Sequence, residues 1–150
     1  MSLETFSKRI KELMREENIS VNALSEELKI ERKSIFLWRN GRYYPKYDAL
    51  IKLIYHFEVS AEYLLGLTDQ PRQVLKREKR IDFEQKFKLR LVKFMDENEC
   101  TMYKMAKDLG IGQTVFKRWV AKGAIPEVSN LIKLSVLTGE TIEYFLGIED

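Results

Sequence analysis

Apolar residues recur at helical spacing along the chain, with polar residues between them. Val21, Leu24 and Leu28 share one helix face at i, i+3 and i+7. Further on, Ile35 and Trp38 lie three apart and can pack back on that face. No run of alternating apolar and polar residues indicates a strand. The pattern therefore predicts an all-α fold in which two short helices meet at a corner.

The same pattern occurs twice. Shifting the sequence by 81 positions aligns its two halves without a gap, so that Trp38 falls on Trp119 and Pro45 on Pro126. A fixed register of this kind indicates an internal repeat. We therefore expect two five-helix domains and a linker, with the boundaries 1–69, 70–82 and 83–150.

Several short polar side chains stand where helices should begin. Such residues can accept a hydrogen bond from the first turn of a helix. The expected caps are Ser20, Asp48 and Ser60 in the first half, and Thr101, Ser129 and Thr141 in the second. Asp82 and Gln85 resemble a capping box for the first helix of the second domain.

The linker holds the basic residues Arg72, Lys76, Arg77, Lys79 and Arg80. Pro71 can open a helix, and no Gly or Pro interrupts residues 72–80. We expect a helical segment here. It can serve only as a solvated spacer, or its basic residues can also contact phosphates.

Two crossed helices, the second presenting its N-terminal side chains outward, form a helix-turn-helix. Just past the second helix stands Trp38-Arg39-Asn40-Gly41-Arg42-Tyr43-Tyr44-Pro45, in which Gly41 can cap the helix and Pro45 prevents its continuation. Residues 60–66 close the unit. The whole resembles the Cro/CI (XRE-type) family of lambda-repressor-like domains. The resemblance implies binding to double-stranded DNA through a recognition helix at about 31–40.

Two positions depart from the family's usual pattern. Val21 stands where a polar residue, often Gln, begins the first helix of the motif, which removes an expected phosphate contact. Arg39 stands where a Glu usually follows the aromatic residue, which adds positive charge near the expected position of DNA.

The net charge is only +3, and its distribution is more informative than its size. Residues 1–69 and 84–150 are each balanced, so the excess lies in 70–83. Within the first domain, residues 29–46 hold six basic residues and one acidic residue. A local basic face on a near-neutral domain is typical of a DNA-binding protein.

The expected site residues fall into two groups. Base edges would be read from the recognition helices by Arg32, Lys33, Ser34, Leu37, Gln113, Thr114 and Lys117. Phosphates would be bound by Asn22, Asn40, Arg42, Tyr43, Lys46, Arg118 and Lys122. Phe36, beside Leu37, can contact a thymine methyl group, or the two can mark a protein-binding surface.

The second copy is the more divergent. Its glycine, Gly123, comes one place later than Gly41, and residues 123–127 lack the basic and aromatic side chains of residues 42–46. This copy can bind DNA weakly, or it can serve mainly for packing and dimerisation.

Other classes of function have little support. His56 is the only histidine and Cys100 the only cysteine, which leaves too few ligands for an ordinary metal site. We therefore expect no enzyme activity and no cofactor. We also expect no small-molecule ligand, since no segment remains for a sensing domain. The chain has no apolar stretch of membrane-spanning length and no signal peptide, so we expect a cytoplasmic protein.

These patterns favour a transcription regulator, with repression the more natural role. It would bind double-stranded DNA, and homodimerisation stays open. The alternative is a non-catalytic interaction module, such as an antitoxin-like or assembly protein, that binds another protein through the same fold.

Overall fold

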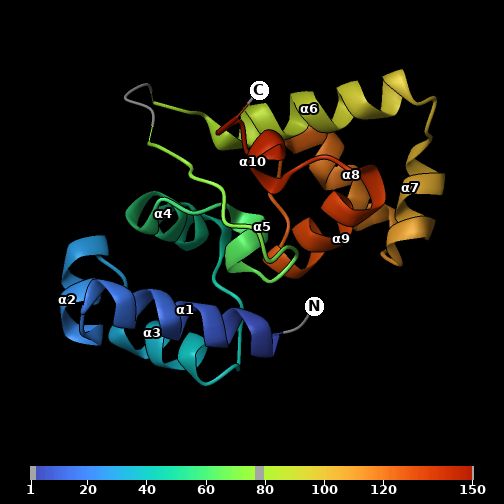
Figure 1. The fold of residues 1–150 in the computed structure, drawn as a ribbon. Coiled ribbons are helices and arrows are strands. Elements are labelled where there is room, and N and C mark those ends of the chain that lie inside the picture. The colour runs from blue at the N-terminus through green and yellow to red at the C-terminus, as the bar shows by residue number, and fades with distance from the viewer. Residues whose placement is uncertain (1–2, 77–79, 150) are drawn as a thin grey trace. The chain divides into compact units, whose positions relative to one another are not determined.

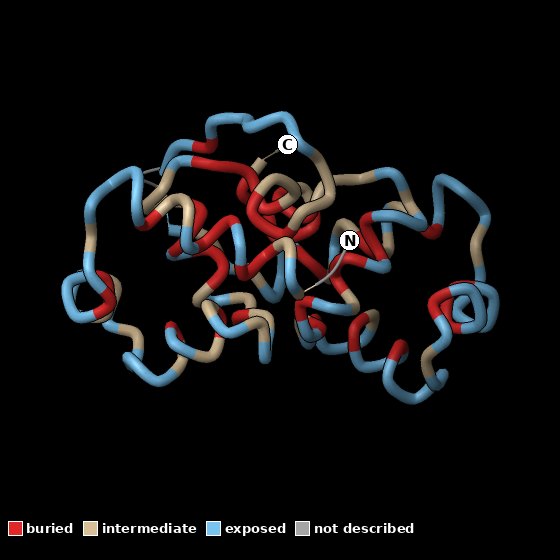
Figure 2. The backbone as a smooth tube through the Cα atoms, turned by 60° about the horizontal axis from the view of Figure 1, so that its bottom comes forward, coloured by how far each residue is buried: buried red, intermediate tan, exposed pale blue. Residues whose placement is uncertain are grey.

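The computed structural model describes residues 3–76 and 80–149, in which the chain forms ten helices and no strand (Figure 1). The all-α prediction is confirmed. The chain divides into two compact units, unit 1 (Met1–Lys76) and unit 2 (Arg77–Asp150). Within each unit the buried residues line the inner sides of the helices, and most loops are exposed (Figure 2).

Unit 1 has five helices in its described part. They are α1 (Leu3–Glu17), α2 (Val21–Leu28), α3 (Arg32–Arg39), α4 (Tyr47–Phe57) and α5 (Ala61–Leu64). The expected recognition helix, α3, packs on both α1 and α2, and α5 packs on α1 and α4. The corner between α2 and α3 is the predicted one.

The core of unit 1 joins α1 to α3 through aromatic rings. Phe6 of α1 is fully buried, and its ring meets that of Trp38 edge to face at 6.5 Å. Ile35, one turn before Trp38, is also fully buried. Edge-to-face pairs contribute about 0.5–1.5 kcal/mol beyond the burial of their area. The inner face of α3 is therefore held firmly, and its outer face stays free.

Unit 2 has helices in the same order. They are α6 (Phe83–Glu97), α7 (Met102–Leu109), α8 (Gln113–Lys122), α9 (Val128–Thr138) and α10 (Ile142–Phe145). Helix α8 packs on α6 and α7, as α3 does on α1 and α2. Phe87 meets Trp119 at 6.3 Å, and Phe116 lies beside Trp119 as well.

An arginine of the first helix closes each unit. The guanidinium of Arg9 donates to the carbonyls of Tyr63 and Thr68, pairs with Asp69 at 2.7 Å and covers the Tyr63 ring. In unit 2, Arg90 likewise donates to two carbonyls near the end of the chain, those of Tyr144 and Glu149, and covers the Tyr144 ring. Each arginine thus ties the first helix of its unit to the backbone at the end of that unit.

Most of the expected helix caps are confirmed. The hydroxyls of Ser20, Ser60, Thr101 and Thr141 each accept a hydrogen bond from the backbone three residues on. The Asp82 carboxylate does the same for Gln85 at 3.1 Å.

The caps expected before α4 and α9 are wrong. Helix α4 begins at Tyr47 and α9 begins at Val128, so Asp48 and Ser129 are the second residues of their helices. The preceding residues, Lys46 and Glu127, take the cap positions without a side-chain hydrogen bond. The pattern of short polar residues cannot separate a cap from a first-turn residue, because both favour Asp and Ser.

The prediction of a helix in the linker is also wrong for the residues that the structure describes. Residues 71–76 and 80–82 carry no helix, and residues 77–79 lie outside the described part. Val74 is buried, its amide donates to the Glu58 carbonyl, and Gln73 donates to the Glu58 carboxylate at 2.8 Å. A short polar helix would bury almost nothing and is marginal in water, whereas the extended segment buries Val74.

We predict that Trp38→Ala lowers the free energy of unfolding of unit 1 by about 3–5 kcal/mol, because it leaves a cavity between α1 and α3. Phe36→Ala, on the exposed side of the same helix, should cost less than about 1 kcal/mol. Urea unfolding followed by circular dichroism compares the two variants. Equal losses would show that Trp38 does not anchor α3.

Candidate nucleic-acid interface

The outer face of α3 carries the expected base-reading residues. Arg32 and Lys33, in its first turn, are exposed, whereas Ser34 and Leu37 are half-buried. The side chains on the opposite face, Ile35 and Trp38, are buried. The helix therefore presents two cations at its N-terminal end, the end that reaches base edges in a helix-turn-helix.

Asn22 of α2 lies beside this face. Its side-chain oxygen accepts a hydrogen bond from Arg32 at 3.2 Å, and both side chains are exposed. The structure thus brings together one expected phosphate-binding residue and one expected base-reading residue. The contact orients the Arg32 guanidinium, whose remaining donors stay available.

Apolar side chains border the same cations. A shallow hollow of about 670 Å³ is lined by Ser25, Glu31, Arg32, Lys33, Phe36 and Leu37. Phe36 is 49% exposed, which is unusual for a phenylalanine on an otherwise polar helix face. A mixed surface of cations and apolar groups suits contact with guanine and with the methyl group of thymine.

The loop after α3 is shaped by the end of that helix. Gly41 has φ +70°, the Gly41 amide donates to the Trp38 carbonyl, and the Arg42 amide donates to the Leu37 carbonyl. This is a Schellman motif, which needs a left-handed residue and favours glycine. Beyond it, the expected phosphate-binding residues Asn40, Arg42, Tyr43 and Lys46 are all exposed.

Tyr44 and Pro45 hold this loop on the core. Pro45 is buried, and the Tyr44 ring lies 5.8 Å from that of Phe6. Burial raises the pKa of the Tyr44 phenol, so this ring stays neutral at physiological pH. Tyr43 and Tyr44 are neighbours in sequence with different roles, one facing solvent and one anchoring the loop.

In unit 2, the surface presented by α8 differs from the one that α3 presents in unit 1. All five expected site residues of this helix are exposed: Gln113, Thr114, Lys117, Arg118 and Lys122. The loop that follows has no basic residue, and Glu127 adds a carboxylate. The helix is also longer than α3, with 10 residues against 8, because its glycine cap, Gly123, comes later.

A second hollow in unit 1 was not expected from the sequence. It has a volume of about 520 Å³ and is lined by Lys11, Met14, Arg15, Asn18, Ile19, Ser20, Val21 and Arg39. Three cations line it and no carboxylate does. The spacing of Lys11 and Arg15, four apart on α1, was a visible signal, but nothing in the sequence placed them beside Arg39.

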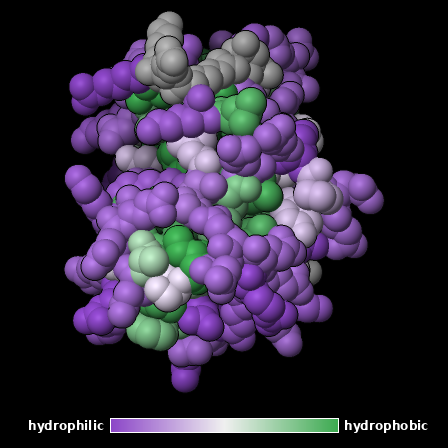
Figure 3. All heavy atoms as spheres, turned by 60° about the vertical axis from the view of Figure 1, so that its left-hand side comes forward, coloured by the Kyte–Doolittle hydropathy of each residue, from purple (hydrophilic) through white to green (hydrophobic). Residues whose placement is uncertain are grey.

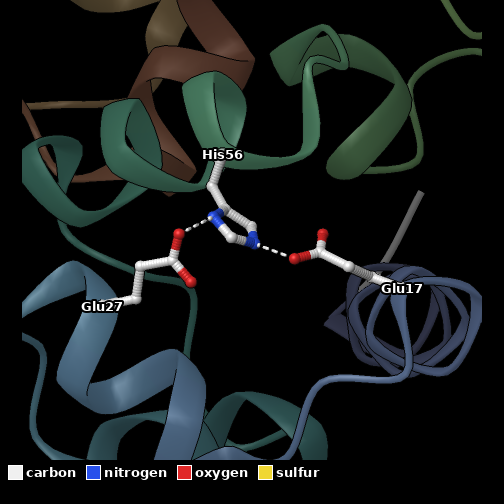
Figure 4. A group of neighbouring side chains, drawn as sticks. All are labelled: Glu17, Glu27 and His56. Carbon is white, nitrogen blue, oxygen red and sulfur yellow. Dashed lines mark hydrogen bonds and ion pairs between the residues drawn. The ribbon is translucent and has the colours of Figure 1, made fainter.

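The structure also gathers Glu17, Glu27 and His56, from α1, α2 and α4 (Figure 4). The His56 side chain is 9% exposed; its Nε2 lies 2.6 Å from Glu17, and its Nδ1 lies 3.6 Å from Glu27. These three residues could hold a metal ion, which the low number of histidines and cysteines in the sequence did not indicate. In the structure each ring nitrogen faces a different carboxylate, so the two carboxylates fix the orientation of the imidazole.

Hydrophobic groups on the surface are small and separated by hydrophilic ones on the face that Figure 3 shows. No helix in the described residues is long and apolar enough to cross a membrane.

Residues 7–70 match a family model described as a helix-turn-helix domain. The match spans almost all of unit 1, and no second copy is detected in unit 2. Searches of curated proteins and of solved structures find no match to the chain. The family match supports a DNA-binding helix-turn-helix regulator in general terms.

Gly123, the glycine cap of α8, is packed more tightly than Gly41, the glycine after α3. A Cβ at Gly123 would lie 2.4 Å from the backbone oxygen of Glu84, whereas one at Gly41 would meet only Ser7, at 3.8 Å. Both glycines have positive φ, so alanine is strained at either position by about 1–2 kcal/mol. Gly123→Ala should therefore destabilise the chain more than Gly41→Ala. Thermal unfolding of the two variants tests this, and a larger loss from Gly41→Ala would contradict it.

Proposed function

We propose that this chain is a sequence-specific transcription regulator, a repressor of the Cro/CI type, that reads the major groove of double-stranded DNA with α3. The main support is the arrangement of α3, in which Arg32 and Lys33 are exposed on the outer face and Trp38 is buried on the inner face. The match of residues 7–70 to the helix-turn-helix domain supports this use of the helix.

Each group would then have a distinct part in recognition. Arg32 donates to O6 and N7 of a guanine, and Lys33 and Ser34 contact neighbouring base edges or phosphates. Leu37, with Phe36, packs against a thymine methyl group. Asn22 and the exposed loop residues, Asn40, Arg42, Tyr43 and Lys46, bind the backbone and set the register in which bases are read.

Unit 2 is, in this proposal, a divergent copy of unit 1. Its helix order, the Phe87–Trp119 pair and the Arg90 contacts parallel those of unit 1. The exposed Gln113, Thr114, Lys117, Arg118 and Lys122 give it a weaker DNA-binding surface, because the loop beyond them offers no cation. It would add affinity to a site chosen by unit 1, or serve in homodimerisation. The single cysteine suits the reducing cytoplasm, where such a regulator acts.

The second candidate is a non-catalytic interaction module, antitoxin-like or part of an assembly. The specific observation in its favour is Phe36, 49% exposed beside Leu37, since exposed aromatic groups are enriched in protein interfaces. The two functions differ in their response to salt.

Binding to duplex DNA should weaken steeply with salt, because each neutralised phosphate releases counterions. About 4–8 phosphate contacts would give a log–log slope of about −4 to −7. Electrophoretic mobility shifts with a random-sequence duplex at several salt concentrations measure this slope. Absence of DNA binding, together with salt-independent capture of a protein partner through Phe36, would favour the interaction module.

Unit 1 should dominate recognition. Arg32→Ala should cost about 1–3 kcal/mol of binding and relax preference at one base pair. Arg42→Ala should weaken all sequences about equally and flatten the salt slope by about one unit. Gln113→Ala should cost less than either, and the three variants can be titrated on one selected duplex. If Gln113→Ala proved the most damaging, unit 2 would be the main reader.

A further inference from the structure

The cluster of Glu17, Glu27 and His56 has the composition and spacing of a metal site (Figure 4). One oxygen of each carboxylate and one nitrogen of the imidazole all lie within 4.8 Å of one another. Zinc binds such ligands at about 2.0–2.2 Å, so that ligand atoms on one tetrahedral ion lie about 3.3–3.5 Å apart. The three groups would therefore have to approach one another by at most about 1.5 Å.

The central group of this cluster is held firmly, whereas the outer two can adjust. The His56 side chain is 9% exposed, and its ring packs edge to face on that of Phe57 at 4.7 Å. The side chains of Glu17 and Glu27 are 39% and 59% exposed, and they lie in the last turns of α1 and α2. A fixed imidazole between two adjustable carboxylates can close around an ion without a movement of the backbone.

The charges of the cluster also favour a cation. Among the described residues, each of the two carboxylates forms an ion pair with His56 and with no lysine or arginine. An imidazole carries at most one positive charge, so at least one negative charge stays without a partner. A divalent ion bound to the neutral imidazole would balance both carboxylates.

Unit 2 is built without this cluster. The 81-residue shift places Asn98 at Glu17, Asp108 at Glu27 and Leu137 at His56. Asn98 donates to a carbonyl of its own helix, Asp108 pairs with a lysine one turn earlier, and Leu137 is 41% exposed. The same helix order therefore forms with none of the three metal-ligating groups, and the packing of the five helices does not require them.

We propose that Glu17, Glu27 and His56 bind a divalent transition-metal ion of the zinc type. Zinc accepts mixed nitrogen and oxygen ligands, whereas magnesium and calcium take oxygen ligands. Three protein ligands leave a further position on the ion for water. Because the ligands come from three helices, the ion would fasten α2, the first helix of the helix-turn-helix, to α1 and α4. This inference does not depend on DNA binding.

Zinc alone, titrated into the full chain without a histidine tag, tests the site. His56 is the only histidine, so NMR can follow its ring nitrogens without ambiguity. We expect a saturable shift of these signals with one ion per chain. Glu17→Gln/Glu27→Gln should weaken zinc binding at least about tenfold, the lower end of the loss caused by removing a group that only supports a ligand. Glu16→Gln/Glu26→Gln makes the same change of charge at the neighbouring exposed positions and should bind as the unaltered chain does.

Thermal unfolding provides a second readout, because an ion that binds only the folded chain stabilises it. Zinc at about a hundred times its dissociation constant should raise the unfolding temperature of unit 1 by about 10 °C or more. The Glu16→Gln/Glu26→Gln variant should show the same rise, and the Glu17→Gln/Glu27→Gln variant should not. If that double variant does not fold, Glu27→Gln and Glu26→Gln give the same comparison, since Glu27 is the more exposed and more distant carboxylate.

Two further controls separate this site from other places where zinc can bind. Magnesium should leave the His56 signals unchanged, because it prefers oxygen ligands and keeps its water. Cys100→Ser should bind zinc as the unaltered chain does, since the thiol lies outside the cluster. Zinc binding without a saturable shift of His56, equal affinity in the two double variants, an equal response to magnesium, or loss of binding in Cys100→Ser would each overturn the inference.

Discussion

The edge-to-face contact between Phe6 and Trp38 is the constraint on which the rest of unit 1 depends. It fastens α3 to α1 from the inside, so the opposite face of α3 is left to solvent. The Tyr44 ring rests on the same Phe6, which links the loop after α3 to this anchor. One buried cluster therefore sets the positions of both the helix face and the loop that the proposed DNA reading requires.

The distribution of charge follows from this arrangement. Because the inner face of α3 is apolar, its cations emerge at the ends of the helix and in the adjoining loop. Arg32 and Lys33 stand at one end, and Arg39 turns back toward α1 at the other. At the positions 81 residues further on, α8 carries the neutral residues Gln113, Thr114 and Val120, and the loop after it carries Glu127. Two units with the same helix order thus present different surfaces, because the side chains that differ are not needed by the core.

Much of the fold could be read from the sequence, because local rules decide it. The spacing of Ile35 and Trp38 indicated the inner face of α3, and Gly41 indicated its end, since a left-handed cap strongly favours glycine. Polar residues were less reliable as markers of where a helix begins, because Asp48, the expected cap of α4, lies inside that helix. The prediction of a helical linker was wrong as well, because the burial of Val74 and its backbone hydrogen bond to Glu58 outweighed the helical tendency of its neighbours.

The sequence by itself determined the helices, their caps in most cases and the exposed cations of α3 and its loop. These depend on residues close together in the chain. Only the tertiary structure decided which distant side chains meet: Arg39 with Lys11 and Arg15, and His56 with Glu17 and Glu27. Such meetings depend on how helices cross, which packing of the whole core sets and no local pattern encodes.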